Sequence, residues 1–360
     1  MRQRRNVRGD GRTLDWFLGY SHHGEARLSP LGPEYLLNSD DQLSLVGHAQ
    51  TAAPSPVSHV STAPVTGSPA FTLVGAAGGL QIDLLWDASV QSSPAWSALE
   101  QAVVAAARIY TNTFSTHAVI NIAVGLGEVG GAALSASALG QSQSTGYLTS
   151  HATMQAALAS HDAALVQGGL MAAKATGALA GLVGESFFIT SAEAKALNLV
   201  SPTSTGVDGY IGLTSSSALY FPASGGAIKP TQYDAVGVAA HELSEIMGRI
   251  GMEGQSLGTH KNIYTPLDVF RYSALNTPDT HPTAGYFSTD GGKTSLSAYN
   301  NPANGGDASD WASSTATRLD AFNAFGTPGV TTQVTASDLL EIAVLGYQII
   351  PGHMLTTTMA

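Results

Sequence analysis

The sequence predicts an α+β protein with a mixed, twisted sheet, a backing helix and a second helix that carries the candidate site. Three observations support this fold class. Strand, helix and strand patterns follow one another over residues 71–127, a helical pattern with polar residues covers 231–248, and 44% of the 360 residues are hydrophobic. A chain of this length and composition can bury a large core, which excludes wholesale disorder.

Residues 1–68 are expected to form an N-terminal extension that is separate from the folded domain. They lack sustained periodicity and end in a stretch rich in Pro, Ser and Thr, TAAPSPVSHVSTAPVTGSP. This composition is typical of an extended, poorly packed linker. We therefore expect one folded domain over residues 69–350 and a short C-terminal tail over 351–360.

The first folded segments predict strands joined by a helix. Residues 71–75 (FTLVG), 80–87 (LQIDLLWD) and 118–127 (AVINIAVGLG) have strand patterns. Between the last two, residues 94–114 carry apolar side chains at helical spacing, with Pro94 near the start. This order of elements suits a right-handed crossover beneath a sheet.

The middle of the chain predicts two helices and a hairpin. One helix is expected near residues 151–158, and a second over 191–200 with Ser191 as its cap. Residues 209–216 and 218–222 are expected to pair as a hairpin. An exposed edge of that hairpin could add a substrate strand, because unpaired backbone groups recognise peptides in a sequence-tolerant way.

The last part of the chain predicts a structural helix and aromatic core residues. The helix is expected to start near Thr335 or Ser337 and to end at Gly346. Trp311 and Phe287 are expected to be core residues rather than substrate platforms.

The helical pattern over 231–248 contains the sequence HELSE, which begins at His241. In an HExxH zinc-protease helix, two histidines four residues apart hold the metal and the glutamate between them activates water. Here Glu245 stands at the second ligand position. Thr231 is expected to cap this helix and Gly248 to end it.

Helical spacing places His241 and Glu245 close together, opposite an apolar stripe. A buried imidazole and carboxylate without partners are costly, and a cation would satisfy both. The alternative is an ion pair between Glu245 and Arg249 on a solvated face. Glu242 falls between the two faces, close enough to the metal side to orient a bound water.

Composition excludes several classes of protein. The net charge is −11 and five of the 15 basic residues lie within the first twelve positions, so a nucleic-acid-binding surface is not expected. The chain has no cysteine, which excludes disulfides and thiolate metal sites and leaves His, Asp and Glu as possible ligands. Neither an apolar run of signal-peptide length nor a transmembrane stretch is apparent, and we expect a monomer.

An ordered series of segments adds a family resemblance. The segments are ITSAEAKALNLV, DGYIGL, YDAVGVAAHELSEIMGR, YTPLDVFRYS, YFSTDGGKTSL, GGDASDW and SDLLEIAVLGY. The series resembles a family of predicted secreted bacterial metalloproteases with an HExxE signature, which are zincins related to the metzincin and aspzincin groups. The resemblance covers most of residues 70–350 and implies a zincin-like domain, bound zinc, an extracellular location and hydrolysis of protein or peptide substrates.

Carried onto this chain, the resemblance makes His241 and Glu245 metal ligands and Glu242 the general base. The third ligand stays open. A metzincin would have a third histidine at position 251, which is glycine here, so the candidates lie downstream at Asp268 and His260.

In an aspzincin the third ligand is an aspartate beyond the helix. Asp268 is preferred over His260, because zinc accepts hard oxygen ligands and the segment around Asp268 is the distinctive one. Tyr272 follows Asp268 as the tyrosine that supports the transition state in that group. The alternatives for Asp268 are a salt bridge to Arg271 or a turn cap.

The resemblance implies Zn²⁺, but two carboxylate ligands would make the metal a weaker Lewis acid and would also suit a harder ion such as Mn²⁺. Asp290, Asp307 and Asp310 lie in Gly-rich loops that could bind Ca²⁺, although Asp and Gly are also what tight turns require, and we favour turns.

Two other functions compete with the protease. A non-catalytic surface or adhesion protein on a degenerate zincin fold would account for the missing second histidine. A glycoside hydrolase that uses Glu242 and Glu245 fits less well, because two carboxylates on one helix do not flank a bond from opposite sides.

Overall fold

The computed structural model describes residues 71–351 except 136, 168–169, 172–174, 216, 258–259 and 282–284. The expected N-terminal extension lies outside the described residues, as does the tail after residue 351. The described chain combines mixed sheets with several helices, which confirms the α+β class. None of the described helices has the length and apolar character that a bilayer-crossing helix needs.

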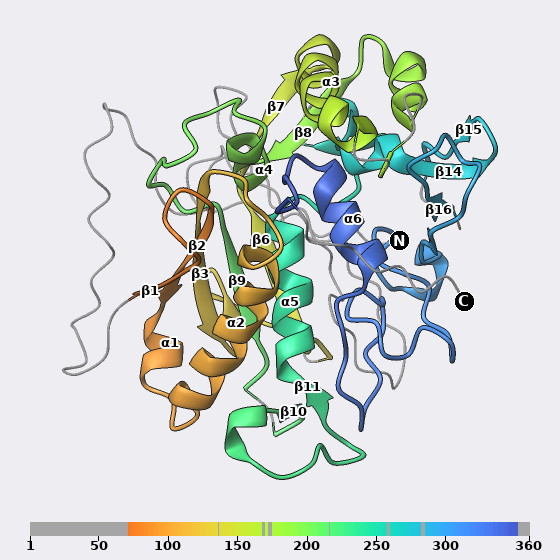
Figure 1. Cartoon of the computed structure of the whole chain (residues 1–360). Coiled ribbons are helices and arrows are strands. Elements are labelled where there is room, and N and C mark those ends of the chain that lie inside the picture. Colours follow the sequence, from red (N-terminus) through yellow and green to blue (C-terminus); the bar gives the residue numbers. More distant parts are fainter. Residues whose placement is uncertain are drawn as a thin grey trace, which may run out of the picture.

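The described elements follow one another in mixed order (Figure 1). The helices are α1 (Ala88–Gln91), α2 (Trp96–Thr111), α3 (His151–Gln167), α4 (Ser191–Ala196), α5 (Ala235–Ile246) and α6 (Ala336–Val344), and the 3₁₀ helices are η1 (Ala175–Leu182), η2 (Pro222–Ser224), η3 (Leu267–Phe270) and η4 (Pro302–Asn304). The strands are β1 (Phe71–Val74), β2 (Leu80–Trp86), β3 (Ala118–Leu126), β4 (Glu128–Val129), β5 (Ala132–Ala133), β6 (Gly140–Ser144), β7 (Gly146–Ser150), β8 (Ser186–Thr190), β9 (Gly209–Leu213), β10 (Leu219–Tyr220), β11 (Tyr233–Asp234), β12 (Gln255–Leu257), β13 (His260–Tyr264), β14 (Arg271–Ala274), β15 (Thr277–Pro278), β16 (Tyr286–Phe287) and β17 (Ser297–Ala298).

The central sheet has five strands in the order β1-β2-β3-β9-β6. Strands β2, β3 and β9 are parallel, whereas β1 and β6 are antiparallel to their neighbours at the two edges. Leu80, Ile82, Leu84 and Trp86 of β2 are buried at every second position, as a strand with one face on a core requires. The expected strand, helix, strand order is confirmed as β2, α2 and β3.

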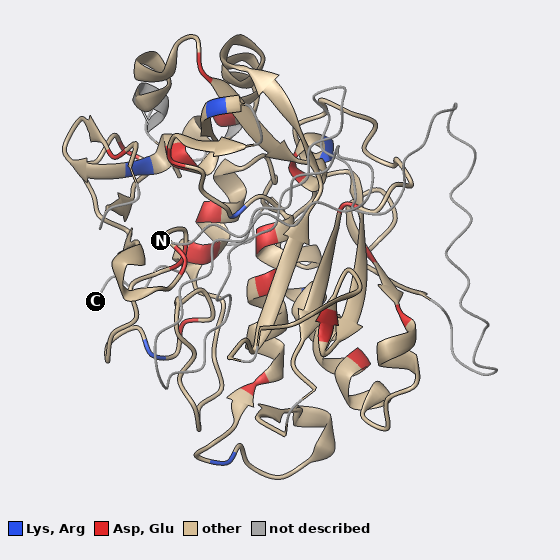
Figure 2. Ribbon diagram, turned by 180° about the vertical axis from the view of Figure 1, so that it is seen from behind, with Lys and Arg blue, Asp and Glu red and all other residues tan. Residues whose placement is uncertain are grey.

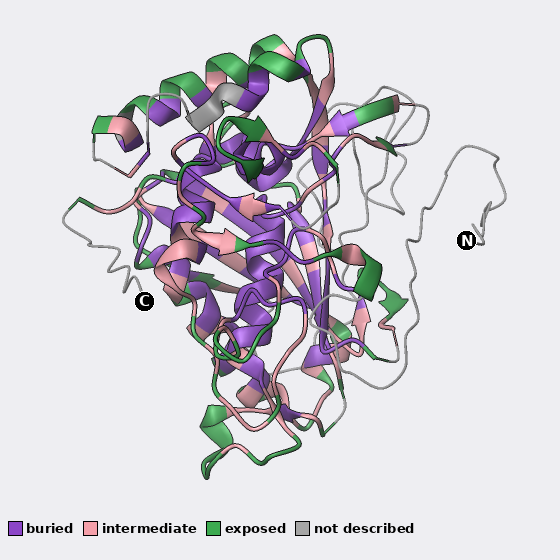
Figure 3. Ribbon diagram, turned by 90° about the vertical axis from the view of Figure 1, so that its right-hand side faces the viewer, coloured by how far each residue is buried: buried purple, intermediate pink, exposed green. Residues whose placement is uncertain are grey.

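Helices α2 and α5 lie side by side against the central sheet, and α5 separates it from α6 and the C-terminal loops (Figure 1). The Tyr110 hydroxyl of α2 donates a hydrogen bond of 2.5 Å to the Ala240 carbonyl of α5. Buried residues gather around the central sheet and α5 (Figure 3). Because α5 is covered on all sides, its polar residues face protein rather than water.

The boundaries of α5 differ from the expectation at one end. Thr231 does not cap the helix, because residues 233–234 first form β11 in parallel with β10. Asp234 is the cap, and its carboxylate accepts a hydrogen bond of 3.1 Å from the Val236 N–H. Gly248 follows the helix with φ 115°, a left-handed conformation that suits glycine and confirms the expected end.

Two further local predictions are wrong. The segments 209–216 and 218–222 do not form a hairpin, because β9 lies inside the central sheet between β3 and β6, and β10 pairs with β11. The edge next to α5 is therefore β6, not β9. Helix α4 is capped by Thr190 rather than Ser191, since the Thr190 hydroxyl accepts a hydrogen bond from the Glu193 N–H.

Two four-stranded sheets flank the central one, in the orders β12-β13-β8-β7 and β15-β14-β16-β17. The expected core residues Phe287 and Trp311 are buried at 0% and 1% exposure. Helix α6 is confirmed near its expected position, with Thr335 and Asp338 forming a capping box at its start.

Asp162 on α3 predicts a pH dependence of stability. It is 7% exposed, and burial raises the pKa of its carboxyl from 3.8 to about 7. Between about pH 4 and pH 7 the folded state therefore keeps a proton that the unfolded state has lost, so stability falls as pH rises through this range.

Asp162→Asn removes this titration. We expect the variant to be more stable than the parent by on the order of 1–3 kcal/mol at pH 8, and the difference to vanish near pH 4, in urea denaturation at both pH values. A difference of the same size at the two pH values would contradict this prediction.

Candidate metal centre

Helix α5 brings three candidate site residues into the interior. His241 and Glu242 are 0% exposed and Glu245 is 1% exposed. The solvated-face alternative for Glu245 and Arg249 is therefore wrong, because Arg249 is also 0% exposed. Seen from behind, acidic residues of α5 lie within the fold rather than on its outer surface (Figure 2).

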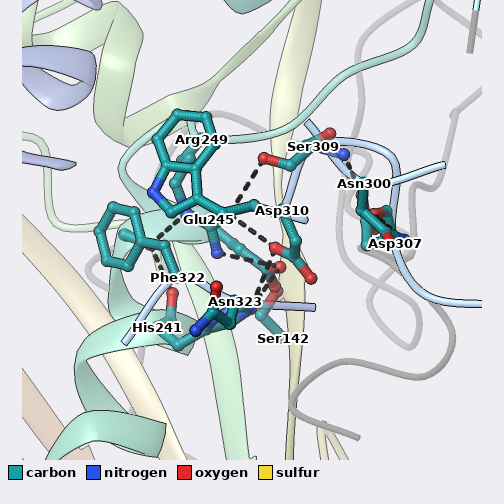
Figure 4. A network of polar contacts seen from close by, with 12 residues as sticks. Ser142, His241, Glu245, Arg249, Asn300, Asp307, Ser309, Asp310, Phe322 and Asn323 are labelled. Carbon is teal, nitrogen blue, oxygen red and sulfur yellow. Dashed lines mark hydrogen bonds and ion pairs between the residues drawn. The ribbon is translucent and has the colours of Figure 1, made fainter. Parts of the chain in front are cut away.

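His241, Glu245 and Asp310 form a compact group of possible metal ligands. His241 Nε2 lies 3.4 Å from Glu245 Oε1 and 3.2 Å from Asp310 Oδ1. One ligand atom from each residue lies within 4.8 Å of the others, and all three side chains are buried. Figure 4 shows them converging from α5 and from the loop before Trp311.

Neighbouring groups orient these side chains. His241 Nδ1 donates a hydrogen bond of 2.9 Å to the Ala321 carbonyl, which turns Nε2 toward the two carboxylates. The Ser142 hydroxyl of β6 donates to Glu245 Oε2. Metal-binding histidines are commonly held through their second nitrogen in this way, and ligating carboxylates are commonly hydrogen-bonded.

Arg249 supplies a fixed cation beside the same carboxylates. Its Nη1 lies 2.6 Å from Asp310 Oδ1 and its Nη2 lies 3.5 Å from Glu245 Oε1. Burial acts to lower the pKa of His241, but the Asp310 charge and the hydrogen bonds with Asp310 and Glu245 together hold that pKa well above its usual value. Burial likewise acts to raise the pKa of Asp310, but His241 and Arg249 lower it.

Glu242 lies beside this group and is fully buried. Both of its carboxylate oxygens are buried, and neither has a partner among the described residues. Burial, and then the charge of Glu245, raise the pKa of Glu242 well above its usual value. Gly140 of the edge strand β6 packs closely against Glu242, because a Cβ atom added at Gly140 would lie 2.6 Å from Glu242 Oε1.

The structure does not bring Asp268 or His260 into the group around His241. Asp268 Oδ2 accepts backbone hydrogen bonds from Met252, Glu253 and Thr265, at 3.2, 3.0 and 2.7 Å. This arrangement fits the turn-cap alternative. His260 begins strand β13 and is half-buried.

Tyr272 lies in β14 at 1% exposure, and burial raises its pKa to about 12. Its role in supporting a transition state stays a prediction.

The sequence pattern did not predict that Asp310 joins His241 and Glu245 in the group that could hold a metal. It indicated this aspartate only as a calcium or turn residue in GGDASDW, although that segment was part of the ordered series. Of the other calcium candidates, Asp290 accepts hydrogen bonds from Ser288 and Thr294, and Asp307 accepts one of 2.7 Å from the Ser309 N–H. These contacts fit tight turns.

The donor set fits a divalent ion. It consists of one imidazole nitrogen and two carboxylates, which suit Zn²⁺ and harder ions such as Mn²⁺. His241 Nε2 and Asp310 Oδ2 are buried and have no hydrogen-bond partner among the described residues. Buried polar atoms without hydrogen bonds are costly, and a bound cation would satisfy them.

Comparison with models of protein families, with curated proteins and with solved structures finds no match for this chain.

The close approach of Gly140 to α5 gives a testable prediction. Gly140→Ala would place a methyl group 2.6 Å from Glu242 Oε1 and 2.9 Å from Val238 Cγ1, so we expect a loss of about 1–3 kcal/mol in the free energy of unfolding. Gly206→Ala is the matched control, because an added Cβ atom there meets nothing within 4 Å. Urea denaturation of both variants measures the difference, and equal stabilities would show that β6 does not constrain Glu242.

Proposed function

We propose that this protein is a divalent-metal-dependent hydrolase that cleaves peptide bonds. His241, Glu245 and Asp310 are the metal ligands, and Glu242 is the general base. The observation that carries the proposal is the position of Glu242. Its two buried oxygens have no hydrogen-bond partner among the described residues, and it lies beside His241, Glu245 and Asp310, which could hold a metal ion. A carboxylate with only a structural role would be expected to have hydrogen-bond partners.

Three protein ligands leave coordination positions for water and substrate, as catalytic metal sites require. When bound, the ion supplies Lewis-acid chemistry, polarising the scissile carbonyl and acidifying a water molecule. Glu242 takes the proton of the attacking water and delivers it to the leaving amine. The Ala321 carbonyl holds the His241 ring, and Ser142 holds the Glu245 carboxylate, so that the ligand atoms stay in place.

Peptide is the preferred substrate class because the ordered series of segments around HELSE resembles secreted HExxE metalloproteases. We extend the proposal to a zincin-like fold and an extracellular location on the same basis. The edge strand β6 lies directly beside Glu242, but its residues are buried at four of five positions, so β6 does not offer a peptide an open edge.

Arg249 favours a second candidate function. Its guanidinium contacts both Asp310 and Glu245 in a site that is almost fully buried. A buried ion-pair network would balance the charges of these carboxylates in this way without a metal ion. The protein would then be a non-catalytic surface or adhesion protein, with this network as part of its core. Metal content separates the two functions.

The purified protein is expected to bind about one divalent ion per chain by mass spectrometry and to cleave casein. A chelator should abolish cleavage, and Zn²⁺ or Mn²⁺ should restore it. Glu242→Gln should keep the fold and the ion but lower kcat/KM by about 10²–10⁴-fold, because the general base is lost. Glu185→Gln, at the half-buried residue before β8, is the matched control and should keep full activity.

An ion-free protein whose casein cleavage resists chelation would exclude the metal-dependent mechanism. A wild-type protein that is inert towards casein with any added ion would favour the non-catalytic candidate.

The third ligand is tested separately. Asp310→Asn should weaken divalent-ion binding by more than about 100-fold, since it removes a ligand rather than a neighbour of one. His260→Gln should leave binding unchanged, because this half-buried residue lies outside the ligand group. Titration against a chromophoric chelator measures both. If His260→Gln weakens binding and Asp310→Asn does not, His260 rather than Asp310 is the third ligand.

A further inference from the structure

Arg249 is held rigidly beside the candidate metal ligands. It is 0% exposed, and its Nε donates a hydrogen bond of 2.7 Å to the Ser244 hydroxyl. Its Nη1 donates one of 3.3 Å to the Ser309 carbonyl, and its guanidinium carbon lies 4.4 Å from the centre of the Phe322 ring. Figure 4 shows this guanidinium against the carboxylates of the ligand group. A side chain fixed by so many contacts stays in place when an ion enters.

The guanidinium contacts the same two carboxylate oxygens that lie close to His241 Nε2. Asp310 Oδ1 lies 2.6 Å from Arg249 Nη1 and 3.2 Å from His241 Nε2. Glu245 Oε1 lies 3.5 Å from Arg249 Nη2 and 3.4 Å from His241 Nε2. A divalent ion between these three ligands would therefore share both carboxylates with a positive charge that is already present.

The charges on the far side of Arg249 do not cancel this effect. Glu341 of α6 attracts Arg249, but burial raises the pKa of Glu341 well above its usual value, which favours its neutral form. Glu341 is also engaged elsewhere, because its Oε1 accepts a hydrogen bond of 2.8 Å from the Tyr299 hydroxyl. The net charge of Arg249 consequently acts on Glu245 and Asp310.

We propose that Arg249 is a positioning residue that serves as a resident cation of the metal centre. It stabilises the fold when no metal is bound, and it lowers the affinity of Glu245 and Asp310 for a divalent ion. This inference rests on the proposed function only in assigning those two residues as ligands. Its physical consequence is a site that takes up and releases its ion without unfolding, unlike metal sites whose ion is required for folding.

The test measures ion affinity and stability rather than activity. Arg249→Met removes the charge and keeps most of the volume, and Arg249→Lys keeps the charge. Arg108→Met, at an exposed position of α2, is the matched control. Zn²⁺ affinity is titrated against a chromophoric chelator, and Tm is measured for the chelator-treated proteins.

We expect Arg249→Met to have a lower Tm without metal but a dissociation constant for Zn²⁺ at least about tenfold smaller than that of the wild type. Arg249→Lys should bind Zn²⁺ like the wild type, and Arg108→Met should change neither property. If Arg249→Met is too unstable to purify, Arg249→Gln removes the charge while its amide can still donate to Asp310, and the same tightening is expected. A purely structural role for Arg249 would lower Tm without tightening Zn²⁺ binding.

The outcomes separate this inference from the proposed function. Wild-type binding with no tightening in the neutral variants would overturn the resident cation and leave the proposed function intact. Zn²⁺ uptake by the neutral variants alone would support the resident cation and overturn a metal-dependent activity of the wild type. Absence of binding in every variant would overturn both, and equal tightening in Arg249→Lys and Arg249→Met would overturn the role of charge.

Discussion

The structure depends on the pairing of charged side chains inside the protein, around helix α5. His241 and Arg249 face Glu245 and Asp310 at distances of 2.6 to 3.5 Å, and none of the four is more than 1% exposed. Taking a charge out of water is costly unless an opposite charge and hydrogen bonds replace the water. The surrounding chain must therefore hold these groups in register, because each of them is unfavourable without the others.

This requirement explains how the fold is assembled around α5. The central sheet contributes Ser142 from its edge strand β6, and the loops after β17 contribute Asp310 and the Ala321 carbonyl. Helix α2 anchors the opposite face of α5 through the bond from Tyr110 to Ala240. The site thus joins segments that are far apart in the sequence, and its geometry depends on the whole described domain rather than on one motif.

Much of the local structure could be predicted from the sequence, because periodicity and capping are local properties. Helix α2, helix α6 and the strands β2 and β3 follow the expected patterns. The prediction that residues 209–222 form a hairpin was wrong, since strand pairing depends on which segments meet in space. A short apolar strand such as β9 has the same sequence pattern at the edge of a sheet and inside it. The pattern therefore did not reveal that β6 pairs with the outer side of β9.

For the candidate site, the sequence by itself determined the residues of the motif helix. Helical spacing alone places His241 and Glu245 on one side of α5, with Glu242 between the two faces. Only the tertiary structure decided what completes the group. It brought Asp310 to His241, left Asp268 as the acceptor of three backbone hydrogen bonds, and buried Arg249 against the carboxylates. Contacts between distant segments are set by packing of the entire chain, and no local spacing rule encodes them.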